Sequence, residues 1–458
     1  MMKKYLSVLL AAVMILSLLA GCGGKPAETP VNPGPTPETP SPTPSEPTPS
    51  VPEEPEAEYG PDGRKVAEEQ IYRTLYVGEI DSMNYLWTST TEDLAVGANC
   101  VDSLVENDAY GNIIPSAAES WEVSDDGMVW TFHLRQGQYW YDAAGNQKDP
   151  VTAHDFVAAA RYLCDSVNQC SNNSLMDGWI TNASEAIYYT ALADAAVAKG
   201  TEKGEEQNAV IDENGVVWEG KNWDATNQVY TEWVEVPAVT PDQIGVVAKD
   251  DYTLEYHLVI PRPYFLTVLQ FGAYWPAPAA LLEELGRDFG LDNEHMWFNG
   301  AYLLTTYEPQ SKRIYTKNEN NWDADRVYIE RIEETYNTEA ATIAPELFLR
   351  GEIDSATLSS DIAAEWLADP AKSQNVCTMR LIGDYSFFIT LNFEPTFDKE
   401  YEPENWGKAV NNENFRKAIF HGFDNITYIA ARYPGDDPET HKSTAITPTG
   451  FSVNNGKG

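Results

Sequence analysis

The chain has 458 residues and a formal net charge of −41, because 71 acidic residues outnumber 30 Lys and Arg residues. This charge argues against nucleic acid and anionic lipid as partners, since both would be repelled. A hydrophobic content of 43% and an aromatic content of 12% are typical of a globular protein, and the chain is long enough for two or more domains.

The first 22 residues carry the signals of export and of attachment to lipid. Lys3 and Lys4 precede an apolar run from Tyr5 to Ala20. This run is shorter than the roughly 20 residues of a membrane-spanning helix, so it predicts a secretory signal peptide. The residues Leu-Ala-Gly-Cys that follow resemble the lipobox of bacterial lipoproteins, which implies that Cys22 becomes the first mature residue and carries lipid. The alternative is a plain signal peptide in which Cys22 is incidental.

A proline-rich segment, residues 23–58, follows the cysteine. Proline blocks helix and sheet hydrogen bonds, and nothing in the segment can build a core. We expect an extended spacer of about 3 Å per residue. The alternative is a degradable tail with no function. Anchor and spacer together predict a lipid-anchored protein on the outer face of the cell membrane, with its folded body held off the bilayer.

The first clear folded element is a β-hairpin within residues 117–140. Asp126 and Gly127 form a turn signal, and Trp121 and Val123 alternate with polar residues before it. The strand after the turn has one apolar face, made of Trp130, Phe132 and Leu134.

A second strand pair, expected around residues 138–147, leads into a capped helix. Thr152 can cap this helix, with Asp155 at the spacing of a capping box. Strands followed by a capped helix predict a small α+β unit. The apolar positions of one helical face are Phe156, Ala160 and Leu163.

The four cysteines other than Cys22 show neither zinc-binding nor CxxC spacing. Export permits a disulfide between Cys164 and Cys170, but two unrelated buried thiols fit the sequence at least as well. The set consists of Cys100, Cys164, Cys170 and Cys377.

Ordered segments of the chain resemble the family 5 extracytoplasmic solute-binding proteins, the oligopeptide- and nickel-binding group. The resemblance is carried first by residues 104–140, "LVENDAYGNIIPSAAESWEVSDDGMVWTFHLRQGQYW", and by "DPVTAHDFV" after them. The matches keep the order of the family and cover most of residues 66–450. Later matches are residues 179–187, 244–269, 299–324, 347–358 and 415–433.

The chain departs from the family pattern in three places. Residues 82–85, Ser-Met-Asn-Tyr, stand where the family often has Leu-Asp-Pro. An acidic, Gly-rich insertion with little helix or strand pattern lies near residues 192–242, and we expect it to be a surface excursion. The chain ends at a point that lies inside the last lobe of the family. We therefore expect an incomplete last lobe that exposes apolar surface after Cys377.

The resemblance implies an α/β fold with two lobes, of the periplasmic-binding-protein type (type II, cluster C), and an extra α+β subdomain. Lobe I is expected to combine residues 59–105 and 273–376. The extra subdomain is expected at residues 106–272, and the start of the last lobe at residues 377–458. In this family the lobes close over a ligand by a hinge, because the ligand contacts both lobes only in the closed state.

The resemblance further implies a monomeric binding protein that captures oligopeptides and delivers them to an ABC permease, without catalysis, cofactor or metal. The same fold leaves open a nickel chelate, a sugar, or a role as a surface sensor. A secreted hydrolase is the more remote alternative. The sequence lacks HExxH, GxSxG, P-loop and GxGxxG motifs, and its six histidines are scattered.

Positions in the family pattern give five candidate ligand-binding residues. Ser89 and Thr90 lie in the loop after the first strand, and Asn172 and Asn173 lie in the loop after the capped helix. Tyr385 lies near the hinge, in the strand expected to open the last lobe. The acidic residue with which the family anchors the amino terminus of a peptide cannot be placed in this chain.

Overall fold

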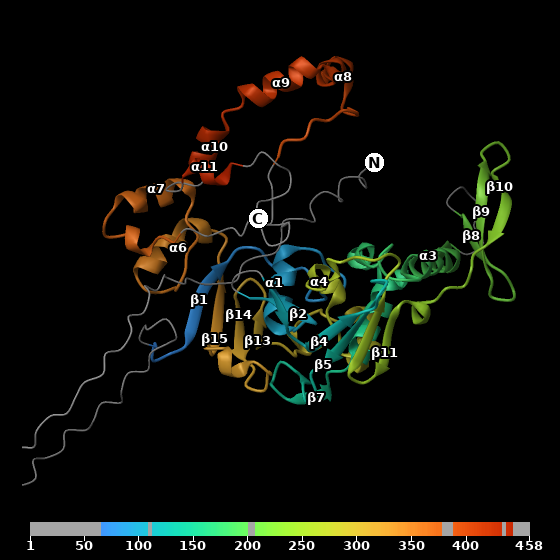
Figure 1. The fold of residues 1–458 in the computed structure, drawn as a ribbon, viewed down its shortest axis with the longest axis horizontal. Helices are drawn as coiled ribbons and strands as arrows, with labels where there is room; N and C mark the ends of the chain where they lie inside the picture. The colour runs from blue at the N-terminus through green and yellow to red at the C-terminus, as the bar shows by residue number, and fades with distance from the viewer. Residues whose placement is uncertain (1–65, 109–111, 200–206, 378–387, 433–436, 443–458) are drawn as a thin grey trace, which may run out of the picture. The chain divides into compact units, whose positions relative to one another are not determined.

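The computed structural model describes residues 66–108, 112–199, 207–377, 388–432 and 437–442. The chain divides after Thr338 into two compact units (Figure 1). The predicted signal peptide with Cys22, the proline-rich segment and Tyr385 lie outside the described residues. Within those residues, the structure contains no helix with the length and apolar character needed to cross a membrane.

One sheet of the first unit pairs a strand from the start of the described chain with strands from residues 302–336. The strand order is β1-β15-β14-β13, with β1 parallel to β15 and the other pairs antiparallel. Residues from both segments expected to form lobe I thus share one sheet, although the lobe boundaries themselves stay a prediction. The strands are β1 (Ile71–Tyr76), β13 (Tyr302–Glu308), β14 (Lys312–Lys317) and β15 (Arg331–Tyr336).

A second sheet contains the predicted hairpin. Its order is β11-β12-β5-β4, and all of its pairs are antiparallel. Gly127 takes a positive φ of 72° in the turn, which glycine adopts without steric cost, and the predicted apolar face of β5 is buried. Trp121 is half-buried, whereas Val123 is exposed. The strands are β4 (Ala118–Val123), β5 (Val129–Leu134), β11 (Val246–Asp250) and β12 (Thr253–His257).

Helix α2 (Ala153–Cys164) confirms the predicted capping box. The backbone N–H of Thr152 donates to Asp155 Oδ2 at 2.8 Å. The predicted apolar face of this helix, which includes Phe156, is buried. The strand pair expected before this helix also forms, between β6 (Tyr139–Tyr141) and β7 (Gln147–Pro150).

The other elements of the first unit are short, apart from α3. A long continuous hydrophobic core joins both sheets and α2, with Trp140, Tyr256 and Phe265 among its largest fully buried side chains. These elements include α1 (Thr91–Cys100), β2 (Val105–Asn107), β3 (Ile113–Pro115), the 3-10 helix η2 (Ser171–Leu175), α3 (Ala183–Lys199), α4 (Phe265–Val268), the 3-10 helix η4 (Gly272–Tyr274) and α5 (Ala279–Leu285).

The prediction of little helix or strand near residues 192–242 is wrong. Helix α3 runs on to Lys199, and three antiparallel strands follow in the order β10-β9-β8. The acidic composition hid short runs of β-branched and aromatic residues, which favour strands. The strands are β8 (Ala209–Ile211), β9 (Val217–Asp224) and β10 (Val229–Glu235), and their small core consists of Leu192, Ala196, Ala209, Val217 and Val236.

The described part of the second unit is helical. Many of its apolar side chains are exposed, Phe420 to 78% and Phe388 to 64%. The expectation of exposed apolar surface after Cys377 is therefore confirmed for the described residues. The helices are α6 (Ala340–Leu349), α7 (Ser360–Ala368), α8 (Pro403–Asn411), α9 (Glu413–Gly422), α10 (Asn425–Arg432) and α11 (Pro438–His441).

The structure decides between the two interpretations of the cysteines. Cys164 and Cys170 are both free and buried, so they are two separate thiols rather than a disulfide. Burial raises the pKa of each thiol to about 12, which keeps it protonated and unreactive at neutral pH. Cys100 is also free and buried, and Cys377 is free and exposed.

Candidate ligand-binding site

The segment between β1 and α1 is fixed at its start by contacts with the buried Arg313. The Arg313 guanidinium lies 3.4 Å from Glu79 Oε1 and 3.6 Å from Glu334 Oε2, and it donates to the carbonyl of Gly78 at 3.0 Å. The same guanidinium stacks 3.8 Å from the ring centroid of Tyr76. These contacts tie the end of β1 to β14 and β15.

Residues 84–90, the 84–90 loop, come next, and hydrogen bonds of the Asn84 side chain set their conformation. Asn84 is buried, and its Oδ1 accepts from the backbone N–H groups of Leu86 and Trp87 at 3.1 and 3.2 Å. Its Nδ2 donates to the hydroxyl of Tyr162 on α2 at 3.2 Å. Every polar atom of the Asn84 side chain is therefore used to set the conformation of the loop.

Close packing holds the same loop from two sides. The hydroxyl of Tyr85 donates to the carbonyl of Pro276 at 2.6 Å, and its ring packs against Trp275 and Phe289. Gly290 has a positive φ of 79°, and a Cβ atom there would lie 2.3 Å from the backbone nitrogen of Asn84. Only glycine allows the two backbones to approach this closely.

The far end of the loop is held by a carboxylate at the start of α1. Asp93 is 2% exposed; its Oδ2 accepts from the Thr88 hydroxyl at 2.5 Å, and its Oδ1 accepts from the backbone N–H of Asp81 at 2.9 Å. The Thr88 hydroxyl in turn accepts from the backbone N–H of Thr90 at 3.2 Å. A carboxylate in the first turn of a helix is also favoured by the helix dipole.

The loop after α2 binds directly to the 84–90 loop. Ser171 donates to the carbonyl of Trp87 from its backbone N–H at 3.3 Å and from its hydroxyl at 2.6 Å. Asn172 Nδ2 donates to the carbonyls of Tyr85, at 3.2 Å, and Thr88. Two segments more than 80 residues apart in the sequence therefore form one rigid unit.

Four of the five predicted residues are brought together by this unit. Asn172 is 4% exposed and uses its amide on the neighbouring loop, so its observed contacts position that loop. Ser89 and Asn173 are half-buried, and Thr90 is exposed. Among the described residues, the side chains of Ser89 and Asn173 have no hydrogen-bond partner, so both are available to a ligand.

Sequence reasoning missed Trp87, which is 41% exposed beside these polar groups. Its backbone is fixed, because its N–H donates to Asn84 and its carbonyl accepts from Ser171. A large indole in a polar stretch, "WTSTTEDL", was the signal that could have identified it. The resulting site offers a hydroxyl, an amide and an aromatic surface, and so suits neutral hydrogen-bonding groups beside an apolar side chain.

Two carboxyl groups with raised pKa values lie elsewhere in the first unit. Burial raises the pKa of Asp102 to about 6, against hydrogen bonds from Asn321 and Trp322. Burial, with the charges of Asp102 and Asp323, raises the pKa of Glu106 to about 7. No group of three or more His, Cys, Asp or Glu side chains in the described ranges is arranged to hold a metal ion.

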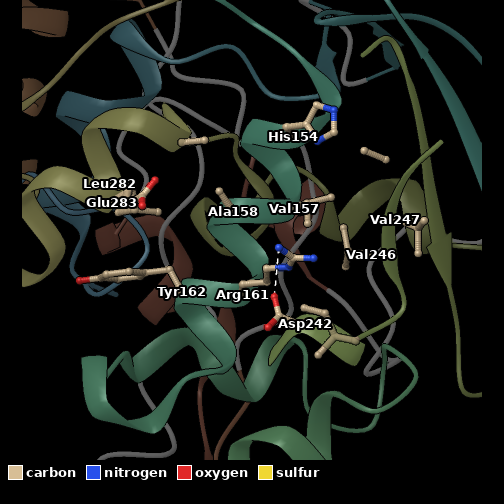
Figure 2. Close-up of a pocket in the computed structure, with 13 residues that line it drawn as sticks. His154, Val157, Ala158, Arg161, Tyr162, Asp242, Val246, Val247, Leu282 and Glu283 are labelled. Carbon is tan, nitrogen blue, oxygen red and sulfur yellow. Dashed lines mark ion pairs between the residues drawn. The ribbon is translucent and has the colours of Figure 1, made fainter. Parts of the chain in front are cut away.

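A groove of about 580 Å³ between α2, β11 and α5 is lined by none of the predicted ligand-binding residues (Figure 2). The loop unit is the better ligand-site candidate, because it carries polar groups without partners at the end of a fixed scaffold. The groove is a separate feature of the first unit.

Comparison with known proteins shows similarity to extracellular solute-binding proteins. The model of the bacterial extracellular solute-binding proteins, family 5, matches residues 112–457. The oligopeptide-binding protein AliB of Streptococcus pneumoniae is 28% identical over 402 residues, covering 86% of this chain and 54% of AliB. The periplasmic oligopeptide-binding protein OppA of Haemophilus influenzae is 28% identical over 365 residues, covering 78% of this chain and 54% of OppA. The chain thus spans about half the length of these curated relatives.

Solved structures support the fold. The substrate-binding domain of an oligopeptide ABC transporter from Bacillus anthracis matches with a TM-score of 0.51 and 25% identity, over 67% of this chain and 49% of that one. Listeria monocytogenes OppA bound to peptide matches with a TM-score of 0.54 and 23% identity, over 85% of this chain and 63% of that one. These similarities confirm the predicted α/β fold of the two-lobed periplasmic-binding-protein type.

Proposed function

Because the chain belongs to the bacterial extracellular solute-binding proteins of family 5, we propose that it captures oligopeptides outside the cell and delivers them to the permease of an ATP-driven importer. The observation that carries this proposal is the pair of hydrogen-bonded loops, which carry the half-buried Ser89 and Asn173 and the exposed Trp87. The similarity to proteins named as oligopeptide-binding supports it.

The proposed ligand chemistry follows from the character of these groups. A peptide main chain offers neutral N–H and C=O groups, which a hydroxyl and an amide can pair without reading the sequence. Trp87 would cover one apolar side chain of the peptide. Asn172 would act by positioning the loop, and Tyr385 would contribute near the hinge. Closure of the lobes would follow from contacts made on both sides of the ligand.

The N-terminal segment supplies the proposed location. A lipid on Cys22 and the spacer at residues 23–58 would hold a monomeric body at the outer face of the membrane. The tether would raise the effective concentration of loaded protein at its permease. The expected lobes, residues 59–105 with 273–376 and the last lobe from 377, remain part of this proposal, as does the extra subdomain at residues 106–272.

Calorimetry with mixed di- to hexapeptides on the full chain tests the ligand class. We expect saturable binding that Asn173→Ala and Trp87→Ala weaken by about 5- to 30-fold, the effect of about 1–2 kcal/mol per lost contact. Asn214→Ala, on the turn between β8 and β9, is the matched control and should leave the affinity unchanged. Saturable binding of a sugar or a nickel chelate, with no binding of any peptide, would overturn the proposal.

A further inference from the structure

The three-stranded sheet β10-β9-β8 lies beside the end of α3, and the helix packs on one of its faces (Figure 1). Val217 of β9 is buried in the small core between this helix and the sheet. Glu219 points to the same face, because its carboxylate accepts from the hydroxyl of Tyr188 on α3. Side chains alternate along a strand, so Trp218 and Gly220 point to the opposite face.

Three aromatic rings meet on this opposite face. Trp233 of β10 stands opposite Gly220 in the strand register, and the Tyr230 ring lies so close to Gly220 that a Cβ atom there would be 2.5 Å from it. The centroid of the Tyr230 ring lies 5.7 Å from that of Trp233 and 5.0 Å from that of Trp223. Asn222 has a positive φ of 57°, which interrupts the regular alternation of side chains and re-aims Trp223. We call the rings of Trp223, Tyr230 and Trp233 the aromatic face.

The aromatic face is accessible and does not fill a core. Among the described residues, the small core of this sheet contains no ring from β9 or β10. Trp233 is 39% exposed, and Trp223 and Tyr230 are half-buried. Exposed Trp and Tyr rings are typical of binding contacts, because each ring covers a large area and has few rotatable bonds to immobilise.

Acidic groups dominate the sheet that carries the aromatic face. Residues 207–236 contain six carboxylates and a single cation, Lys221, whose Nζ lies 2.5 Å from Glu219 Oε1. Within the part of the chain that the structure describes, the other five carboxylates form no ion pair. Glu235 stands two positions after Trp233 and so shares its face. Such a surface repels anionic partners and complements cationic ones. The six carboxylates are those of Asp212, Glu213, Glu219, Asp224, Glu232 and Glu235.

We propose that the aromatic face binds a segment of a partner protein that carries arginine side chains. A planar guanidinium stacks on the electron-rich face of an indole or phenol ring and can pair with a carboxylate at the same time, which an ammonium does less well. The same stacking occurs within this chain, where Cζ of Arg262 lies 3.8 Å from the ring centroid of Trp179. Glu235 supplies the carboxylate beside Trp233. This site is separate from the 84–90 loop and does not depend on the proposed peptide transport.

The test titrates the full chain with the blocked peptide acetyl-Gly-Arg-Gly-Arg-Gly-amide, followed by calorimetry. We expect saturable binding that Trp233→Ala weakens about 5- to 30-fold. Glu235→Gln should weaken it about threefold. Val229→Ala is the matched control, because Val229 is 44% exposed on the same strand and lies outside the aromatic face, and it should leave the affinity unchanged. Asn173→Ala, at the candidate ligand-binding site, should also leave it unchanged.

A second measurement leaves the protein unchanged. Citrulline in place of both arginines keeps the shape of each side chain but removes its charge, and should weaken binding about tenfold. Absence of saturation up to about 1 mM peptide overturns the proposal, as does equal affinity for the two peptides. Binding that Asn173→Ala weakens and Trp233→Ala does not would place the peptide at the 84–90 loop and would also overturn it. So would saturable binding of a neutral oligosaccharide such as chitohexaose that Trp233→Ala abolishes, or a dimer in sedimentation that the same variant dissociates, because a glycan or a second copy would then occupy the face.

Discussion

Replacement of Asn172 by Ala removes one of the two links between the loops of the candidate site and leaves the hydrogen bonds from Ser171 to Trp87 in place. The amide nitrogen of Asn172 donates to the carbonyls of Tyr85 and Thr88, and both of these residues are buried. Each lost hydrogen bond leaves a buried acceptor unpaired and costs about 1–1.5 kcal/mol, so the variant should lose about 2–3 kcal/mol of loop stability. Amide hydrogen exchange at Trp87 and Thr88 measures this loss, because both N–H groups donate to the carbonyl of Asn84 inside the loop.

The neighbouring variant Asn173→Ala separates positioning from ligand contact. Its side chain has no hydrogen-bond partner among the described residues, so its removal should change loop exchange by less than about 0.5 kcal/mol while weakening peptide binding. Asn172→Ala should raise exchange at Trp87 and Thr88 about 30- to 150-fold, as 2–3 kcal/mol requires. Equal exchange in the two variants would refute the assignment of Asn172 to positioning.

Three further outcomes follow from the structure. Folding raises the pKa of Glu106 from 4.5 to about 7, so its contribution to the free energy of unfolding is fully present below pH 4.5 and is lost as the pH rises to 7. In urea unfolding, Glu106→Gln should therefore reduce the loss of unfolding free energy between these pH values by about 1–2 kcal/mol. Gly290→Ala should lower the free energy of unfolding by about 2–4 kcal/mol, because its Cβ would collide with the backbone of Asn84. The control Gly215→Ala, at a position with a φ of 82° and open space, should lower it by about 1 kcal/mol. Equal losses in the two variants would contradict the collision. A thiol reagent mapped by peptide should label Cys377 in the native chain, and labelling of the buried thiols before unfolding would contradict their burial. These thiols are Cys100, Cys164 and Cys170.

Local signals in the sequence were sufficient for the hairpin and the first capped helix. The turn at Asp126 and Gly127 and the capping box at Thr152 and Asp155 both form, because each depends on residues within a few positions of one another. Composition was a poorer guide in the insertion. Its acidic residues suggested a loop, but short runs of β-branched and aromatic residues in β9 and β10 pair into a small sheet.

The sequence by itself determined which segments carry the candidate site, and the tertiary structure decided what each residue does there. Position in the family pattern selected Asn172 and Asn173 alike. The structure separates them, because the amide of Asn172 meets carbonyls more than 80 residues away while that of Asn173 stays available. The exposed Trp87 and the aromatic face of β9 and β10 likewise emerge only from non-local pairing. Partners distant in the chain are chosen by packing and by the need to satisfy buried polar groups, and no short stretch of sequence contains that information.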